Sequence, residues 1–157
     1  MPVYGNPETL ADIRRRWDYI FNPHTQLGGG KPQISLNPVS GPFAVRGETV
    51  TPIPAWHGRL PVLGYRVGCF AYLTDCSDLP VESRELLRGL DLFVLGAIRR
   101  RPHTTHFNLD QALAVVADLK PRMTYLTHLT HDLEHEETSR GLPPGVALGY
   151  DGLKLDC

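Results

Sequence analysis

Seven histidines stand among the 157 residues, and five of them lie between His103 and His135. Two histidines and one aspartate come directly after segments that we expect to be strands: His57, Asp75 and His128. The carboxyl ends of strands in an open α/β sheet border the crevice in which ligands bind. Two imidazoles and a carboxylate brought together there would suit a borderline divalent metal such as zinc or manganese.

Each of these residues also has a structural interpretation. A single histidine after a strand is more often a hydrogen-bonded structural residue than a metal ligand, and an aspartate at a strand end commonly forms a turn. The coincidence of three such positions favours a metal site, but spacing alone leaves both interpretations open.

A second metal motif competes with the first. His131 and His135 are four residues apart in the string HDLEH, and on a helix they would share one face, as in the HExxH helix of zinc proteases. Asp132 stands where that motif needs the longer glutamate to reach a metal-bound water. The alternative is a solvated helix whose acidic side chains pair with nearby histidines.

Other chemical signals are weaker. The run Gly28 to Lys31 is not a phosphate loop, because the upstream glycine is missing and Pro32 replaces the serine or threonine. The run Arg99 to Arg101 could contact phosphate, although a charge run is usually solvated surface. Cys69 and Cys76 flank an expected strand and are predicted to be small buried residues.

Composition limits the classes of function. Lys and Arg number 16 and Asp and Glu number 17, a net charge of −1, which argues against a nucleic-acid coat or a polybasic membrane binder. The three cysteines, the third being Cys157, form no CxxC pair and no even disulfide set, so we expect a reducing, cytoplasmic setting. No apolar span suits a membrane helix, and MPVYGNPETL has no signal-peptide pattern.

Hydrophobic periodicity and the positions of glycine and proline predict the elements that would position these residues. A helix is predicted from Pro7 to about Trp17 with Asn6 as its N-cap, followed by a long loop over 22–42 with a short strand near 33–36. Further strands are predicted at 43–46, 48–53, 62–67, 70–74, 92–95, 124–127, 147–150 and 153–155, and further helices at 81–87, 109–119 and 133–140. Strands followed by strand–helix alternation predict a layered α/β domain with a mixed sheet.

Five strings together resemble the metallo-β-lactamase-fold hydrolases: PIPAWHG, FAYLTDCS, RPHTTHFNLDQALA, TYLTHLTHDLEHEE and LPPGVALGYDGLKL. Within that family they are most similar to the phosphoribosyl cyclic phosphate phosphodiesterases, which are related to tRNA-processing ribonuclease Z. The resemblance covers nearly the whole chain. It implies the C-terminal portion of an αββα sandwich, with mixed sheets and flanking helices.

The resemblance also implies roles for single residues. His57 would bind the first metal, Asp75 would bridge two metals, and His128 would bind the second. His106 would contact the substrate phosphate and protonate the leaving oxygen as general acid. Two metals would polarise the phosphoryl group and activate a water for in-line attack on phosphorus. His131 and Asp132 would be supporting residues that orient His128 or its neighbours.

The sequence departs from the family pattern at two places. It contains no HxHxDH motif, which in the family precedes a segment like PVYGNPETL, so we expect residues 1–157 to be a single, N-terminally truncated domain that holds one metal or none. Gly96 stands where relatives usually carry an aspartate that supports the site.

The function expected from this resemblance is hydrolysis of a small, cyclic or linear phosphodiester. The alternative is an inactive homologue that binds metal weakly or not at all. The partners expected besides the substrate are a second copy of the chain or a complementing N-terminal fragment, with neither nucleic acid nor membrane.

Overall fold

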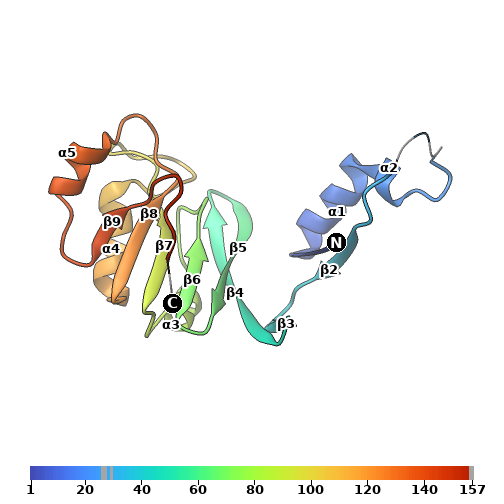
Figure 1. The fold of residues 1–157 in the computed structure, drawn as a ribbon, viewed down its shortest axis with the longest axis horizontal. Coiled ribbons are helices and arrows are strands. Elements are labelled where there is room, and N and C mark those ends of the chain that lie inside the picture. The colour runs from blue at the N-terminus through green and yellow to red at the C-terminus, as the bar shows by residue number, and fades with distance from the viewer. Residues whose placement is uncertain (26–27, 29, 156–157) are drawn as a thin grey trace. The chain divides into compact units, whose positions relative to one another are not determined.

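The computed structural model describes residues 1–25, 28 and 30–155, and the chain divides into two units, Met1–Phe43 and Ala44–Cys157 (Figure 1). Gly29 of the glycine run and Cys157 lie outside the described residues. The single domain over residues 1–157 stays a prediction, and each unit is described by itself.

The first unit pairs two short parallel strands beside a helix. Strand β1 (Pro2–Gly5) pairs with β2 (Ser35–Pro38), while α1 (Pro7–Arg16) and α2 (Asp18–Phe21) lie between them in the chain. The predicted N-cap is confirmed, because the Asn6 side chain accepts a hydrogen bond of 2.7 Å from the Thr9 backbone N–H. The strand expected at 33–36 is shifted by two residues, and neither β1 nor α2 was predicted.

The second unit contains a mixed sheet of seven strands in the order β3-β4-β5-β6-β7-β8-β9. Strands β4, β5 and β6 pair antiparallel, and β6 to β9 pair parallel, which confirms the expected mixed sheet. The strands are β3 (Phe43–Val45), β4 (Glu48–His57), β5 (Leu60–Val67), β6 (Phe70–Leu73), β7 (Leu92–Gly96), β8 (Met123–Thr127) and β9 (Val146–Leu148); the helices are α3 (Val81–Leu86), α4 (Leu109–Leu119) and α5 (His135–Arg140).

Two boundaries differ from the predicted ones for physical reasons. Strand β4 continues past the expected end at Ile53 to His57, because residues 54–57 pair antiparallel with residues 60–63 of β5. The Trp56 backbone N–H also donates to the Asp78 carbonyl on the other side. The predicted strand at 153–155 is wrong. The turn at 151–152 forms, but the residues after it pair with no strand among the described residues.

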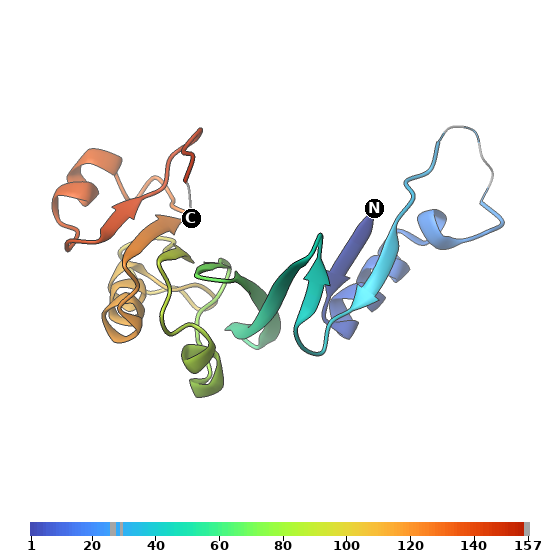
Figure 2. The same ribbon diagram turned by 60° about the horizontal axis from the view of Figure 1, so that its bottom comes forward.

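The core lies on one face of the parallel strands. Inward-facing residues of β6 to β8 pack against the apolar face of α4, which lies along the sheet in Figures 1 and 2. The residues of this core that are at most 5% exposed include Ala71, Leu73, Phe93, Leu95, Leu126, Leu109, Ala112, Val115 and Leu119. Because side chains alternate along a strand, Tyr72 points to the other face and is 44% exposed. This packing fixes where the carboxyl ends of the strands lie.

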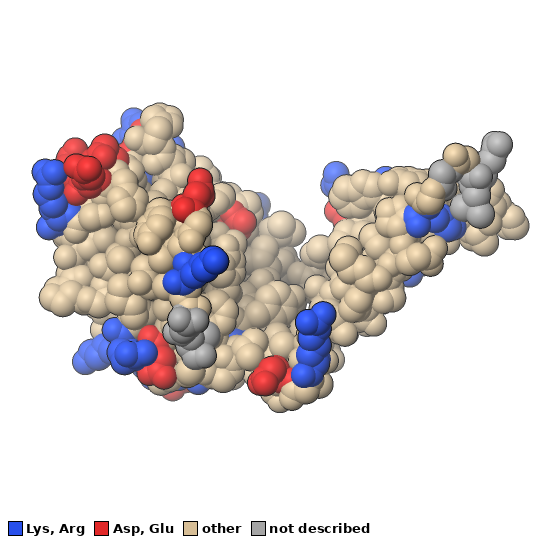
Figure 3. Space-filling view, viewed as in Figure 1, with Lys and Arg blue, Asp and Glu red and all other residues tan. Residues whose placement is uncertain are grey.

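Charge is mixed over the surface. In Figure 3 basic and acidic side chains stand next to one another on the second unit, in keeping with pairs such as Arg140 with Glu136 on α5. In the described part of the chain, no helix combines the length and the apolar character that crossing a membrane requires.

Gly96, the last residue of β7, touches the segment that carries Asp75. A Cβ placed on Gly96 would lie 3.3 Å from the Cα and the Oγ1 of Thr74 and 3.4 Å from the Asp75 backbone nitrogen. Such distances are tight, and two of the three neighbours are backbone atoms that cannot rotate away. The absence of a side chain at this position therefore lets the end of β6 lie close to β7.

A capping box begins α4 and joins it to the loop before it. The Asn108 side chain accepts from the Gln111 backbone N–H at 2.9 Å, and the Gln111 side chain accepts from the Asn108 N–H at 3.0 Å. The Asn108 amide also donates to the Arg100 carbonyl at 3.0 Å. Asn108 thus secures both the helix and the preceding loop.

Replacing Asn108 with alanine should lower the free energy of unfolding by about 1–2 kcal/mol, because the Gln111 backbone N–H in the first turn of α4 loses its acceptor. Asn108→Asp keeps a side-chain acceptor and should lose less. Urea unfolding of both variants measures the difference, and equal losses would contradict a capping role.

Gly96→Ala should lower the free energy of unfolding by about 1–3 kcal/mol, because the new methyl group overpacks the backbone at Thr74 and Asp75. Gly141→Ala is the matched control. Its Cβ would meet only the Thr138 carbonyl at an ordinary 3.6 Å, so a change within about 0.5 kcal/mol is expected. Thermal and urea unfolding of both variants test this, and similar losses for the two would refute the close approach.

Candidate functional site

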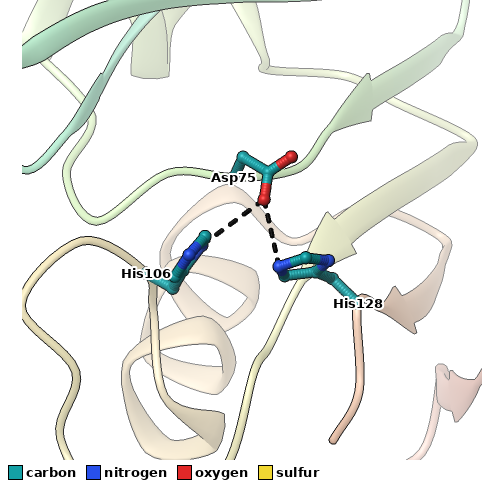
Figure 4. Close-up of side chains that lie close together, drawn as sticks. All are labelled: Asp75, His106 and His128. Atoms are coloured by element: carbon teal, nitrogen blue, oxygen red, sulfur yellow. Dashed lines mark ion pairs between the residues drawn. The ribbon is translucent and has the colours of Figure 1, made fainter.

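Asp75, His106 and His128 converge at the carboxyl edge of the parallel strands (Figure 4). One ligand atom from each lies within 4.8 Å of the others. The Asp75 Oδ1 is 3.0 Å from the His128 Nε2 and 3.6 Å from the His106 Nδ1. Asp75 follows β6, His106 stands between β7 and α4, and His128 follows β8, so three separate segments supply the cluster.

His57 joins this cluster through His106. The Nε2 atoms of the two rings are 3.2 Å apart, and the rings meet edge to face with centroids 4.6 Å apart. The structure therefore brings together all four residues singled out from the sequence. The predicted set of ligands, however, was His57, Asp75 and His128, whereas it is His106 that shares the tight group with Asp75 and His128.

The backbone turns sharply at two of these residues. Asp75 and His128 have φ values of 51° and 61°, in the left-handed region that non-glycine residues rarely occupy. Each stands shortly after a strand, and the intervening strand β7 ends at Gly96. Unfavourable backbone conformations of this kind cluster at functional sites, where the surrounding structure maintains them.

The loop that carries His106 is held on two sides. The Phe107 backbone N–H donates to the Cys76 carbonyl at 2.7 Å, which joins the loop to the Asp75 segment. On the other side Thr105 packs on Gly58, where a Cβ would lie only 2.9 Å from the Thr105 methyl carbon. These contacts fix His106 relative to both Asp75 and His57.

The electrostatics of His106 are those of a desolvated imidazole. Its side chain is 14% exposed, and among the described residues its Nδ1 is a buried atom without a hydrogen-bond partner. Burial lowers the pKa of His106, the nearby His57 and His128 lower it further, and Asp75 partly opposes them. A pKa below the ordinary range leaves the His106 ring neutral at neutral pH, so a nitrogen lone pair is available.

This donor set fits a divalent cation. A histidine that binds a metal must be neutral and a carboxyl ligand must be ionised, and the cluster offers imidazole and carboxyl groups within reach of one point. The unpaired nitrogen of His106 is the kind of buried polar atom that a bound cation would satisfy. Nitrogen and oxygen donors in this combination are used by zinc and by manganese.

The expected supporting pair, His131 and Asp132, lies elsewhere. His131 is 97% exposed and its Nε2 is 3.6 Å from the carboxylate of Asp132, which also lies 3.5 Å from the Arg101 guanidinium. Within the described residues, neither forms a hydrogen bond or ion pair with His128. Their predicted role in orienting His128 finds no contact to support it.

The second metal motif lacks its helix. Helix α5 begins at His135, and residues 131–133 form a turn and a bend, so His131 and His135 do not share a helix face. Glu134 caps α5 by accepting from the backbone N–H groups of Glu136 and Glu137. Those hydrogen bonds lower the pKa of Glu134. The segment is therefore a helix start, and the zinc-protease alternative fails on geometry.

One nearby residue was missed from the sequence. The His103 ring lies 4.8 Å from the His106 ring, centroid to centroid. The spacing of the two histidines in the string HTTH was the available signal. The burial predicted for the two cysteines is confirmed for Cys76 but not for Cys69, which is only partly buried. Burial together with Asp75 and Asp78 raises the pKa of Cys76 to about 12.

Comparison with known proteins agrees with this fold. A family model described as "Beta-lactamase superfamily domain" matches residues 1–129. A crystal structure described as a new diphosphatase from the PhnP family is 41% identical, with a TM-score of 0.89 over 99% of this chain and 57% of that chain. The metallo-β-lactamase fold protein YhfI from Bacillus subtilis is 16% identical, with a TM-score of 0.72 over 97% of this chain and 63% of that one, and shares the fold.

A longer protein is also similar. An octanoyltransferase from Porphyromonas gingivalis is 36% identical over 160 residues, which cover 98% of this chain and 32% of that protein. The chain thus spans about a third of this relative and less than two thirds of the diphosphatase. Because the family model matches residues 1–129, most of the chain, the chain belongs to the beta-lactamase superfamily domain family, with the metallo-β-lactamase fold.

Proposed function

We propose that this chain contributes to metal-dependent hydrolysis of a phosphodiester. The observation that carries the proposal is the convergence of Asp75, His106 and His128 on one point at the strand edge. A second support is the 41% identical structure, which is described as a diphosphatase. The cluster supports metal-dependent chemistry, and the diphosphatase supports cleavage of a bond to phosphorus, so the proposed substrate class is a small molecule with a phosphate ester or anhydride.

Each side chain has a role that follows from its position. Asp75, His106 and His128 would hold a divalent cation, zinc or manganese, and the Asp75 carboxylate would offset part of its positive charge. A bound cation supplies a Lewis acid for the phosphoryl oxygens and makes a water nucleophile available near neutral pH. His57 orients the His106 ring through their 3.2 Å contact and offers a further nitrogen donor. His106 is thus proposed here as a metal ligand, and its role as general acid stays a prediction.

Acyl transfer is the reaction named for the relative from Porphyromonas gingivalis. A thiol nucleophile for such a reaction would need a thiolate, and the raised pKa of Cys76 keeps it protonated. Two thirds of that relative also lie outside the match. We therefore favour phosphoryl chemistry for this chain, although the fold by itself does not decide between the two.

The test combines metal binding with turnover. Calorimetric titration of the metal-free chain with zinc or manganese, followed by hydrolysis of bis(4-nitrophenyl) phosphate, should give one tightly bound ion per chain and metal-dependent turnover. Asp75→Asn and His128→Ala should each weaken metal binding by about 100-fold or more, since even residues that only support ligands change affinity by about 10–100-fold.

His131→Ala is the matched control, because it removes an exposed histidine and should leave metal affinity and turnover unchanged. Less than about one ion per chain and no turnover would favour the alternative of an inactive homologue. Turnover of an octanoyl thioester in preference to the phosphodiester would favour acyl chemistry at the same site. We propose a second copy of the chain or a complementing fragment as the partner. Turnover that rises steeply with protein concentration would support such an association.

A further inference from the structure

His103 stands beside the cluster without belonging to its ligand group. Its ring is partly buried and lies 4.8 Å from the His106 ring at an interplanar angle of 46°. The two residues share one short loop, which the contacts of Thr105 with Gly58 and of Phe107 with Cys76 hold in place. His103 is thus presented to the site by the same contacts that position His106.

The hydrogen bonds of His103 decide which of its nitrogens carries the proton. The Thr105 backbone N–H donates to the His103 Nδ1 at 3.3 Å, and the Thr105 hydroxyl lies 3.3 Å from the same atom. A backbone N–H can only donate, so Nδ1 must be unprotonated. In the neutral ring the proton is therefore on Nε2, and this N–H is a hydrogen-bond donor at the atom that Thr105 does not contact.

A phosphodiester at this site needs donors that are not metal ligands. Asp75, His106 and His128 offer lone pairs to a cation, and a carboxylate repels the phosphate oxygens. The neighbouring arginines are engaged elsewhere: Arg99 donates to the carbonyls of Arg101 and Pro102, Arg100 donates to Thr138, and Arg101 pairs with Asp132. Among the described residues, the Nε2–H of His103 has no acceptor, so it is available to donate to a ligand.

We propose that His103 is a substrate-binding residue whose Nε2–H donates to a phosphoryl oxygen of the substrate. The inference rests on the proposed phosphodiester hydrolysis and extends it to how the anion is held. One loop would thus supply two functions, a metal ligand from His106 and a phosphate-binding donor from His103.

Two substitutions separate the two nitrogens of His103. His103→Asn keeps an acceptor where Nδ1 stands, which preserves the bond from Thr105, but it removes the Nε2 donor. His103→Gln places an amide N–H near the position of Nε2. His131→Asn is the matched control at an exposed histidine. All three variants and the unaltered chain are measured with zinc or manganese bound.

Titration with inorganic phosphate should show about 10- to 100-fold weaker binding for His103→Asn, the range expected for losing a hydrogen bond to a charged group. His103→Gln should recover most of the affinity, and His131→Asn should match the unaltered chain. With bis(4-nitrophenyl) phosphate the loss should appear mainly in KM. Metal affinity and the unfolding midpoint should stay unchanged, which a merely structural role for His103 would not allow.

Long-range 1H–15N NMR of the histidine rings in the metal-free chain adds a readout that needs no turnover. The Nε2-protonated tautomer is expected for His103, and the Nδ1-protonated form would overturn the inference. Equal phosphate affinity in His103→Asn and the unaltered chain would overturn it too, as would a lack of phosphate binding in the unaltered chain. If phosphate binds through His103 but no phosphodiester is cleaved, the proposed function fails while the anion site stands.

Discussion

The close contact between Asp75 and His128 is the constraint on which the rest of the site depends. Their Oδ1 and Nε2 atoms are 3.0 Å apart although 53 positions separate the residues in the chain (128 − 75 = 53). The contact exists because β6, β7 and β8 are parallel neighbours whose carboxyl ends share one edge. A left-handed backbone at both residues then turns their side chains toward one another.

Gly96 and α4 maintain that constraint from two directions. Gly96 ends the middle strand without a side chain, so the Thr74–Asp75 backbone can lie against it. On the sheet face below, buried residues of β6 to β8 pack on α4 and prevent the strands from shifting in register. Apolar packing thus supports a polar cluster whose own interactions are few and partly exposed.

The charge balance of the cluster explains what it can hold. Asp75 brings one negative charge to a group that otherwise consists of imidazoles, and burial keeps His106 neutral. Three or four nitrogen and oxygen donors suffice for one divalent ion, since catalytic zinc sites commonly use three protein ligands. YhfI shares this fold at 16% identity, and a fold by itself does not fix one activity.

The sequence by itself determined the elements whose signals are local. Helix α4 has the predicted bounds because apolar spacing and a capping box act within a few residues, and α1 begins at its predicted cap. The sequence also identified four residues that meet at the site. Only the tertiary structure decided that β4 reaches His57 and that 153–155 is not a strand. It also decided that His106 rather than His57 joins Asp75 and His128 in the tight group. The pairing of Asp132 with Arg101 is a third outcome of this kind. Those outcomes depend on pairing, hydrogen bonds and ion pairs between segments, which the pattern within one segment does not encode.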